Sequence, residues 1–371
     1  MPFLDCTRHR IFSWLLAGSI FTGSLLAAGC TAGSGNRNPE TQISPVQAAD
    51  PVPYQSLQPS DRVIVYYFSS FGDYLFPATR KVLKRKPAYQ AALDSLFKGP
   101  KDFDLAFSFL PEDLYPQEAF VLERTMYLDF GPQLSDSLSA RRLVEPGLRQ
   151  LVYTMTEFDD VEAVQILGGG KAPVFKIGNF ELWRPLSRPP VINPAPLAEL
   201  FPTASTPAET FPGAGSGFSS VTMVPVKLYF HLTGTPFVVP TTRFAKAGAA
   251  PGNRSEYLVP ILRELLTGPS QGENRVKGIF PEGTNLRGVY SDQESVARVD
   301  FGPDILSAVL RGSTDGKMAV EGLVLTLTEL PGIQRVQIMV GGKVVGSFPG
   351  YPDVARPMAR PRWINPWPGE F

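Results

Sequence analysis

The sequence contains very few of the residues on which catalytic and metal sites usually depend. Its 371 residues include two cysteines, Cys6 and Cys30, and two histidines, of which His231 is the one beyond the N-terminal segment. Two cysteines cannot build a disulfide framework or a cysteine zinc cluster. A lone histidine more often fills a packing position than a ligand or triad position. The sequence therefore predicts no metal and no cofactor.

An excess of either charge is also missing. The 35 basic residues balance 35 acidic ones, so no overall basic field favours nucleic acid as a partner. The one dense basic stretch is "TRKVLKRK", from Thr79 to Lys86. Such a stretch is usually a solvated face, and the alternative is contact with anionic lipid or wall polymer.

Long apolar runs are absent except at the N-terminus. Arg8 and Arg10 precede an uncharged segment from Ile11 to Ala28, the pattern of an export signal. The segment ends in "LAAGC", which resembles a bacterial lipobox and implies cleavage before Cys30 and attachment of lipid, such as palmitate, to that cysteine. An uncleaved membrane anchor is the alternative. We expect a signal peptide over residues 1–29 and a disordered tether over residues 30–60.

The chain repeats itself with an offset of 172 residues. "LVYTMTEFDDVEAVQILGGGK" from Leu151 and "LVLTLTELPGIQRVQIMVGGK" from Leu323 are identical at eleven of twenty-one positions. "RPLSRPPVINP" from Arg184 likewise matches "RPMARPRWINP" from Arg356. A period this long indicates a duplicated domain. We expect domains over residues 61–194 and 224–366, a linker rich in Pro, Ala, Ser and Gly over 195–223, and a tail over 367–371.

Each copy shows the same order of predicted elements. A β-rich run opens it, a helix follows, and short strands precede a second helix, a strand and a hairpin. The apolar positions of the second helix fall at helical spacing: Leu148, Leu151, Val152, Met155 and Phe158 in one copy, and Val320, Leu323, Val324, Leu327 and Leu330 in the other. The sequence thus predicts an α+β fold of two tandem small domains, each a mixed or antiparallel sheet packed with two helices.

These motifs resemble the GerM domain family, which is named for a bacterial lipoprotein of spore formation and germination. The matching stretches are "ELLTGP", "FPEGTNLRGV", "ARVDFGP", "LTLTELPGIQRVQIMVGGK" and the "RP…RP…INP" ending; the first copy has "LPEDLYPQEA" in place of the "PEGT" stretch and lacks "LPG". The resemblance implies an extracytoplasmic, membrane-tethered protein of the spore-forming cell. Its layout is also similar to ring-building modules, which implies assembly rather than chemistry.

Two motifs suggest nucleotide chemistry, and their contexts argue against it. "DFG" occurs at Asp129 and again at Asp300, without the glycine-rich loop, strand lysine and "HRD" loop of a kinase. The lysines of "LGGGK" and "VGGK" are followed by Ala172 and Val344, whereas a phosphate loop requires Ser or Thr there. We interpret Gly341-Gly342 as a hairpin turn.

Recurring carboxylates are the remaining candidates for catalysis. Asp129, Asp300, Glu157 and Glu329 occupy matching positions in the two copies, and a glycosidase needs only two well-placed acids. The structural alternative gives each Asp a turn or capping bond and each Glu a hydrogen bond at a helix end. We favour that alternative, because a duplicated catalytic pair is seldom needed.

The sequence thus predicts a lipid-anchored binding or assembly module rather than an enzyme. The expected partners are envelope or sporulation-complex proteins, peptidoglycan, the membrane through its lipid, and further copies of the chain. The alternatives are a peptidoglycan-degrading enzyme that uses the paired carboxylates and a binder of small molecules between the domains. The two "RPxxRPxxINP" tails are expected to lie extended over their own domains, with polyproline recognition by a partner as the alternative.

Overall fold

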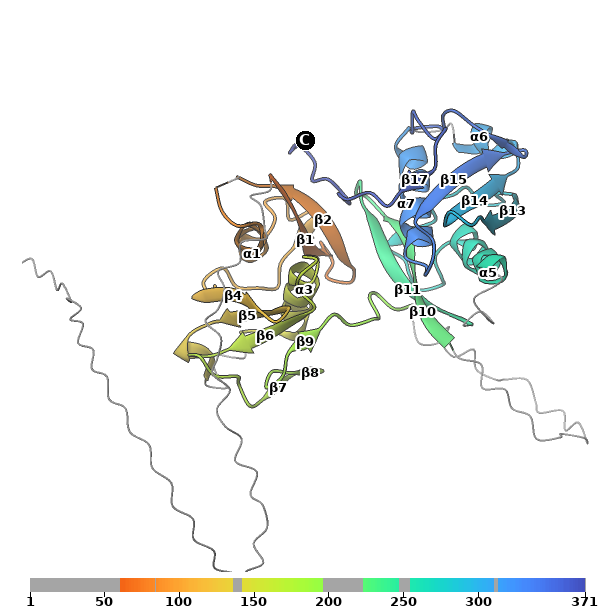
Figure 1. The fold of residues 1–371 in the computed structure, drawn as a ribbon. Coiled ribbons are helices and arrows are strands. Elements are labelled where there is room, and N and C mark those ends of the chain that lie inside the picture. The colour runs from red at the N-terminus through yellow and green to blue at the C-terminus, as the bar shows by residue number, and fades with distance from the viewer. Residues whose placement is uncertain are drawn as a thin grey trace, which may run out of the picture. The chain divides into compact units, whose positions relative to one another are not determined.

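The structure is a computed structural model that describes residues 61–83, 85–135, 142–195, 223–246, 254–309 and 313–370. The predicted signal, tether and most of the linker lie outside these residues. Two tandem α+β repeats make up the described part, as predicted (Figure 1). None of the helices described there is long and apolar enough to cross a membrane.

A long β-hairpin opens each repeat. In the first repeat β1 (Arg62–Ser69) pairs antiparallel with β2 (Leu75–Lys81) and with the short β3 (Ala106–Phe107). In the second repeat β10 (Met223–Leu232) pairs in the same way with β11 (Val238–Lys246) and β12 (Val276–Lys277). Each hairpin is therefore the core of its own three-stranded sheet.

A second, mixed sheet completes each repeat. In the first repeat the strand order is β4 (Glu118–Leu122), β5 (Thr125–Asp129), β6 (Ala163–Leu167) and β9 (Leu186–Ser187). In the second it is β13 (Leu286–Ser291), β14 (Val296–Phe301), β15 (Arg335–Val340) and β16 (Lys343–Val344), with β17 (Met358–Ala359) also on β15. The sequence predicts one sheet per domain, and the strands in fact divide between two.

A crossover helix joins the parallel strands of each mixed sheet, as parallel pairing requires. Helix α3 (Glu145–Met155) links β5 to β6 and also packs on β1, so it lies between the two sheets of its repeat (Figure 1). Helix α7 (Ser313–Thr328) does the same between β10 and β15. The predicted apolar stripes face these contacts, and Leu151 and Leu323 are fully buried.

Smaller elements complete the fold. Helix α1 (Ala88–Lys98) packs on β1, and its counterpart α5 (Arg254–Thr267) packs on β10, β11 and β13. A 3-10 turn η1 (Pro132–Ser135) and helix α6 (Asp304–Val309) follow the two "DFGP" motifs. The short pair β7 (Lys176–Ile177) and β8 (Phe180–Glu181) belongs to the first repeat alone within the described residues.

The two "INP" endings do more than lie over their own domains. The Asn365 side chain accepts a hydrogen bond from Val238 N–H at 2.9 Å and donates to Val238 C=O at 2.7 Å, both within its own repeat. It also donates to Pro77 C=O of the first repeat at 2.8 Å. Asn193 mirrors this with Leu75 N–H, Leu75 C=O and Pro240 C=O of the second repeat. The expectation for the tails was therefore wrong in part, because each asparagine joins the two repeats.

Candidate functional site

The first recurring aspartate organises a glycine turn. Asp129 is the last residue of β5, and its Oδ1 accepts N–H bonds from Gly131 and Gly169, each at 2.8 Å. Its Oδ2 accepts the N–H of Gly170 at 2.6 Å. All three glycines have positive φ, which glycine adopts at little cost. The "DFG" and "GGG" motifs thus form one structural unit.

Asp300 holds the equivalent turn in the second repeat. Its Oδ1 accepts the N–H of Gly342 at 2.8 Å, and Arg287 Nε lies 3.4 Å from its Oδ2. Gly341 and Gly342 connect β15 to β16 as the predicted hairpin. The lysine of each motif follows the turn rather than opening a helix, so the geometry is that of a hairpin and not of a phosphate loop.

The recurring glutamates lie at the ends of the crossover helices, in matching clusters. Glu157 Oε1 accepts the Tyr66 hydroxyl at 2.8 Å and Arg188 Nη2 at 2.7 Å. Arg188 also donates to the Thr156 hydroxyl at 2.8 Å and to the Tyr153 carbonyl at 2.7 Å. The arginine therefore fastens the tail of the first repeat to the end of α3.

The second cluster repeats this arrangement and adds a lysine. Glu329 Oε1 accepts the Tyr229 hydroxyl at 3.1 Å and lies 2.6 Å from Arg360 Nη2, while Lys227 Nζ donates to Oε2 at 3.0 Å. Thr328 Oγ1 donates to the Val324 carbonyl at 2.6 Å. The recurrence of Thr328 and Glu329 thus coincides with structural hydrogen bonds, as the sequence suggests.

Burial sets the electrostatics of both clusters. It raises the pKa of Tyr66 and of Tyr229, and the neighbouring carboxylate of Glu157 or Glu329 raises it further, so both phenols stay protonated donors. Burial on its own also raises the pKa of Glu329. The positive charges of Arg360 and Lys227 outweigh it, so the pKa lies below the usual range. Glu329 is therefore a charged acceptor and has no proton to give as a general acid.

The structure also places the other residues singled out in the sequence. His231 is buried, and its Nε2 lies 2.6 Å from the Thr235 carbonyl in a turn. In the described residues no three His, Cys, Asp or Glu side chains gather as a metal cluster would need. Cys30 lies outside the described residues.

One arginine of the basic stretch has a structural role. Arg80 pairs with Glu370 at 2.7 Å, and its guanidinium lies 4.6 Å from the centroid of the Trp367 ring. By contrast, Lys86 is exposed and pairs with Asp94 at 2.6 Å. The solvated-face interpretation therefore fits Lys86 and does not fit Arg80.

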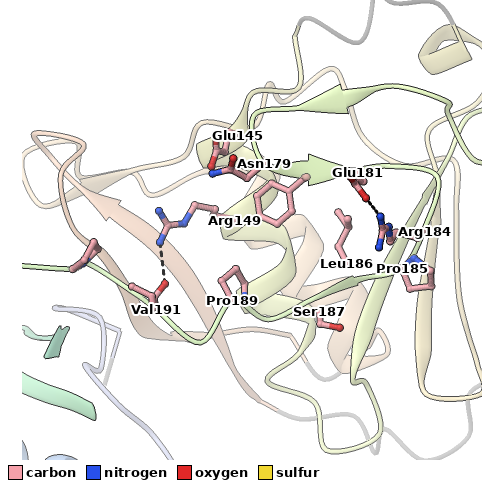
Figure 2. A pocket seen from close by; sticks show the side chains of 12 residues that line it. Glu145, Arg149, Asn179, Glu181, Arg184, Pro185, Leu186, Ser187, Pro189 and Val191 are labelled. Carbon is pink, nitrogen blue, oxygen red and sulfur yellow. Dashed lines mark hydrogen bonds and ion pairs between the residues drawn. The ribbon is translucent and has the colours of Figure 1, made fainter. Parts of the chain in front are cut away.

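A groove in the first repeat was not foreseen from the sequence. Its volume is 460 Å³, and it lies between the start of α3, the residues around β8 and the tail that leads to Asn193. Figure 2 shows Arg149 and Arg184 toward opposite ends, with Leu186 and Pro189 between them. No sequence pattern marks such a hollow, because it arises from the packing of three separate segments. A further cavity of 320 Å³ is lined by Asp73, Arg275 and their neighbours from both repeats.

Comparisons with known proteins agree with the duplicated fold. The family model described as "Germane: Sporulation and spore germination" matches residues 64–173 and again residues 227–346. The spore germination protein GerM of Bacillus subtilis (strain 168) is 27% identical over 135 residues, which span 35% of this chain and 37% of that protein. The chain thus matches little more than a third of the length of this relative.

A solved structure shows the fold of both repeats together. The tandem GerMN domains of the sporulation protein GerM from Bacillus subtilis match with a TM-score of 0.55 and 19% identity, covering 82% of this chain and 98% of that one. The two family matches take up more than half of the sequence. This chain therefore belongs to the GerM domain family and carries two tandem copies of the family's domain.

Proposed function

We propose that this chain is a lipid-anchored extracytoplasmic protein whose tandem domains act as a binding and assembly module of the cell envelope in sporulation or spore germination. One observation supports assembly over catalysis more than any other. Each of the four recurring carboxylates is held by backbone N–H groups, arginines or tyrosines of its own repeat. The relatives are described as sporulation and germination proteins, which supports the setting.

The proposed anchor is the acylated Cys30. After cleavage of residues 1–29, residues 30–60 tether the domains outside the membrane. The domains themselves extend over residues 61–194 and 224–366, and residues 195–223 link them. The proposed partners are envelope or sporulation-complex proteins and peptidoglycan, with self-association as a further mode of assembly.

Genetic replacement in the organism that carries this chain tests the proposal. Deleting the gene is expected to lower the yield of heat-resistant spores or their germination, and the wild-type gene should restore it. A gene with Cys30→Ala should yield the unprocessed precursor without acylated product, as seen by mass spectrometry of the N-terminal peptide, and should not restore function. Cys6→Ala is the matched control, since the signal carrying it is removed.

Two results would contradict the proposal. The first is a deletion strain with normal sporulation and germination. The second is a Cys30→Ala protein that is processed and works like the wild type, which would mean that residue 30 does not carry the anchor.

A further inference from the structure

We infer that the groove of the first repeat is a binding site for a short peptide with free carboxylates, of the kind that branches from cell-wall glycan. This inference rests on the proposed function, because it places the domains where wall is present. The groove volume of 460 Å³ suits a small ligand, whereas a partner protein needs a broad surface.

Arg149 lies at one end of this groove, which Glu145 also lines, so this end carries one charge of each sign. Its Nη2 donates to the Val191 carbonyl over a long 3.5 Å (Figure 2). Its Nε is buried and has no partner among the described residues. A guanidinium has five donors in a fork that matches a carboxylate, and Arg149 meets the Val191 carbonyl and the Tyr153 hydroxyl, so its remaining donors suit a carboxylate ligand.

The other end of the groove favours an anion. Glu181 pairs with Lys176 at 2.6 Å and with Arg184, so two positive charges already lie beside its one negative charge. Trp183 is 40% exposed beside them, with Lys176 Nζ 5.6 Å from its ring centroid. This end therefore carries one more positive charge than negative, next to an exposed aromatic ring.

Between the ends, the lining is suited to the apolar parts of a short peptide. Leu186, Pro185 and Pro189 line the groove, while Asn179 and Ser187 offer polar side chains. A short peptide with two carboxylates, each toward a different end, would contact Arg149 with one and Arg184 with the other. The stem peptides of cell wall have this chemistry, since they are short and carry several free carboxylates.

The second repeat provides an internal comparison. Arg149 is replaced there by Glu321, which pairs with Lys317 at 3.6 Å. Asn179 is replaced by Tyr351, a larger side chain that packs against the hydrophobic core, and Trp183 by Ala355. Of the groove-lining residues, Arg149 and Asn179 are thus specific to the first repeat, whereas Arg184 is retained as Arg356. This divergence is what separate roles for the two domains would produce.

Calorimetric titration of the purified full chain tests the inference. The probe is synthetic L-alanyl-γ-D-glutamyl-L-lysyl-D-alanine with free carboxylates, and saturable binding is expected. Arg149→Gln and Arg184→Gln should each weaken binding about tenfold to a hundredfold, the range for one charge-assisted contact. Asn179→Tyr, which copies the second repeat, should abolish it. Arg356→Gln, the position equivalent to Arg184, is the control and should bind like the wild type.

Three further probes identify the source of the ligand. The same peptide with both carboxylates amidated should not bind, and neither should a tetramer of N-acetylglucosamine. An α-linked L-peptide of the same composition should bind at least tenfold more weakly, and equal or tighter binding would overturn the assignment to cell wall in favour of a protein segment. Absence of saturable binding, or equal affinity in all folded variants, would overturn the site. Either result leaves the Cys30 experiment untouched, so the two proposals fail separately.

Discussion

The Glu329→Ala variant is expected to lose about 3 kcal/mol of unfolding free energy, the lower end of the range for removing one partner of a buried ion pair. The carboxylate accepts bonds from Tyr229, Lys227 and Arg360, and its side chain is 19% exposed. Without it, the charges of Arg360 and Lys227 remain close together and uncompensated. The melting temperature should fall by roughly 5–10 °C, measured by scanning calorimetry.

A double variant separates the cluster from unrelated effects. Arg360→Ala in the Glu329→Ala background should cost much less than Arg360→Ala in the wild type, because the two residues share one interaction. Glu282→Ala is the control, since Glu282 is exposed and its loss should change stability by less than about 0.5 kcal/mol. Unchanged stability of the Glu329→Ala variant would contradict a structural role, because removing a catalytic acid often leaves stability intact or raises it.

The same cluster gives stability a dependence on pH. The pKa of Glu329 in the folded chain lies below its usual value of 4.5, since its cationic partners outweigh the effect of burial. Its contribution is therefore complete above about pH 4.5 and is lost as the pH falls through the lower pKa of the folded state. Urea unfolding at pH 7 and pH 3 should show a larger loss in the wild type than in Glu329→Gln, which lacks the titrating group.

Asn365→Ala should have an effect of similar size or larger. The side chain is 3% exposed and makes three hydrogen bonds, to Val238 N–H, Val238 C=O and Pro77 C=O. Leaving buried backbone groups without partners costs about 1–3 kcal/mol each, so a loss of about 3–5 kcal/mol is expected. Asn365 also has a φ of 50°, which asparagine tolerates better than alanine does.

The shape of the unfolding transition should change as well. Asn365 bonds to both repeats, so its loss is expected to weaken their coupling and to split or broaden the calorimetric transition. Asn274→Ala is the control, because Asn274 is exposed. A single sharp transition with less than about 0.5 kcal/mol of loss would show that the bridge contributes little.

The elements of this fold follow closely from the sequence, because apolar spacing determines which face of each element is buried. Leu323, Leu327 and Leu330 are buried as their spacing predicts, and so are Val336 and Ile338 of the following strand. The duplication strengthened the prediction of which positions are buried. A position that is apolar at the same place in both copies indicates a buried side chain rather than an exposed one.

Long-range polar contacts could not be predicted in the same way. Asp129 and Gly170 recur in both copies, yet nothing in their spacing indicates that β5 and the turn after β6 are neighbours. The hydrogen bond from Asn365 to the Pro77 carbonyl joins residues at nearly opposite ends of the chain. The short "INP" motif does not indicate which residue its asparagine binds. The division of the strands between two sheets is equally a property of packing, not of local pattern.

We propose that the recurring carboxylates hold the structure together rather than perform chemistry. The most direct measurement is the release of soluble fragments from purified peptidoglycan by the full chain, compared with the Asp300→Asn and Glu329→Gln variants. We predict no release above a boiled sample of the same protein, for the wild type and both variants alike. Steady turnover by the wild type that disappears in either folded variant would contradict the claim and identify the chain as a wall-degrading enzyme.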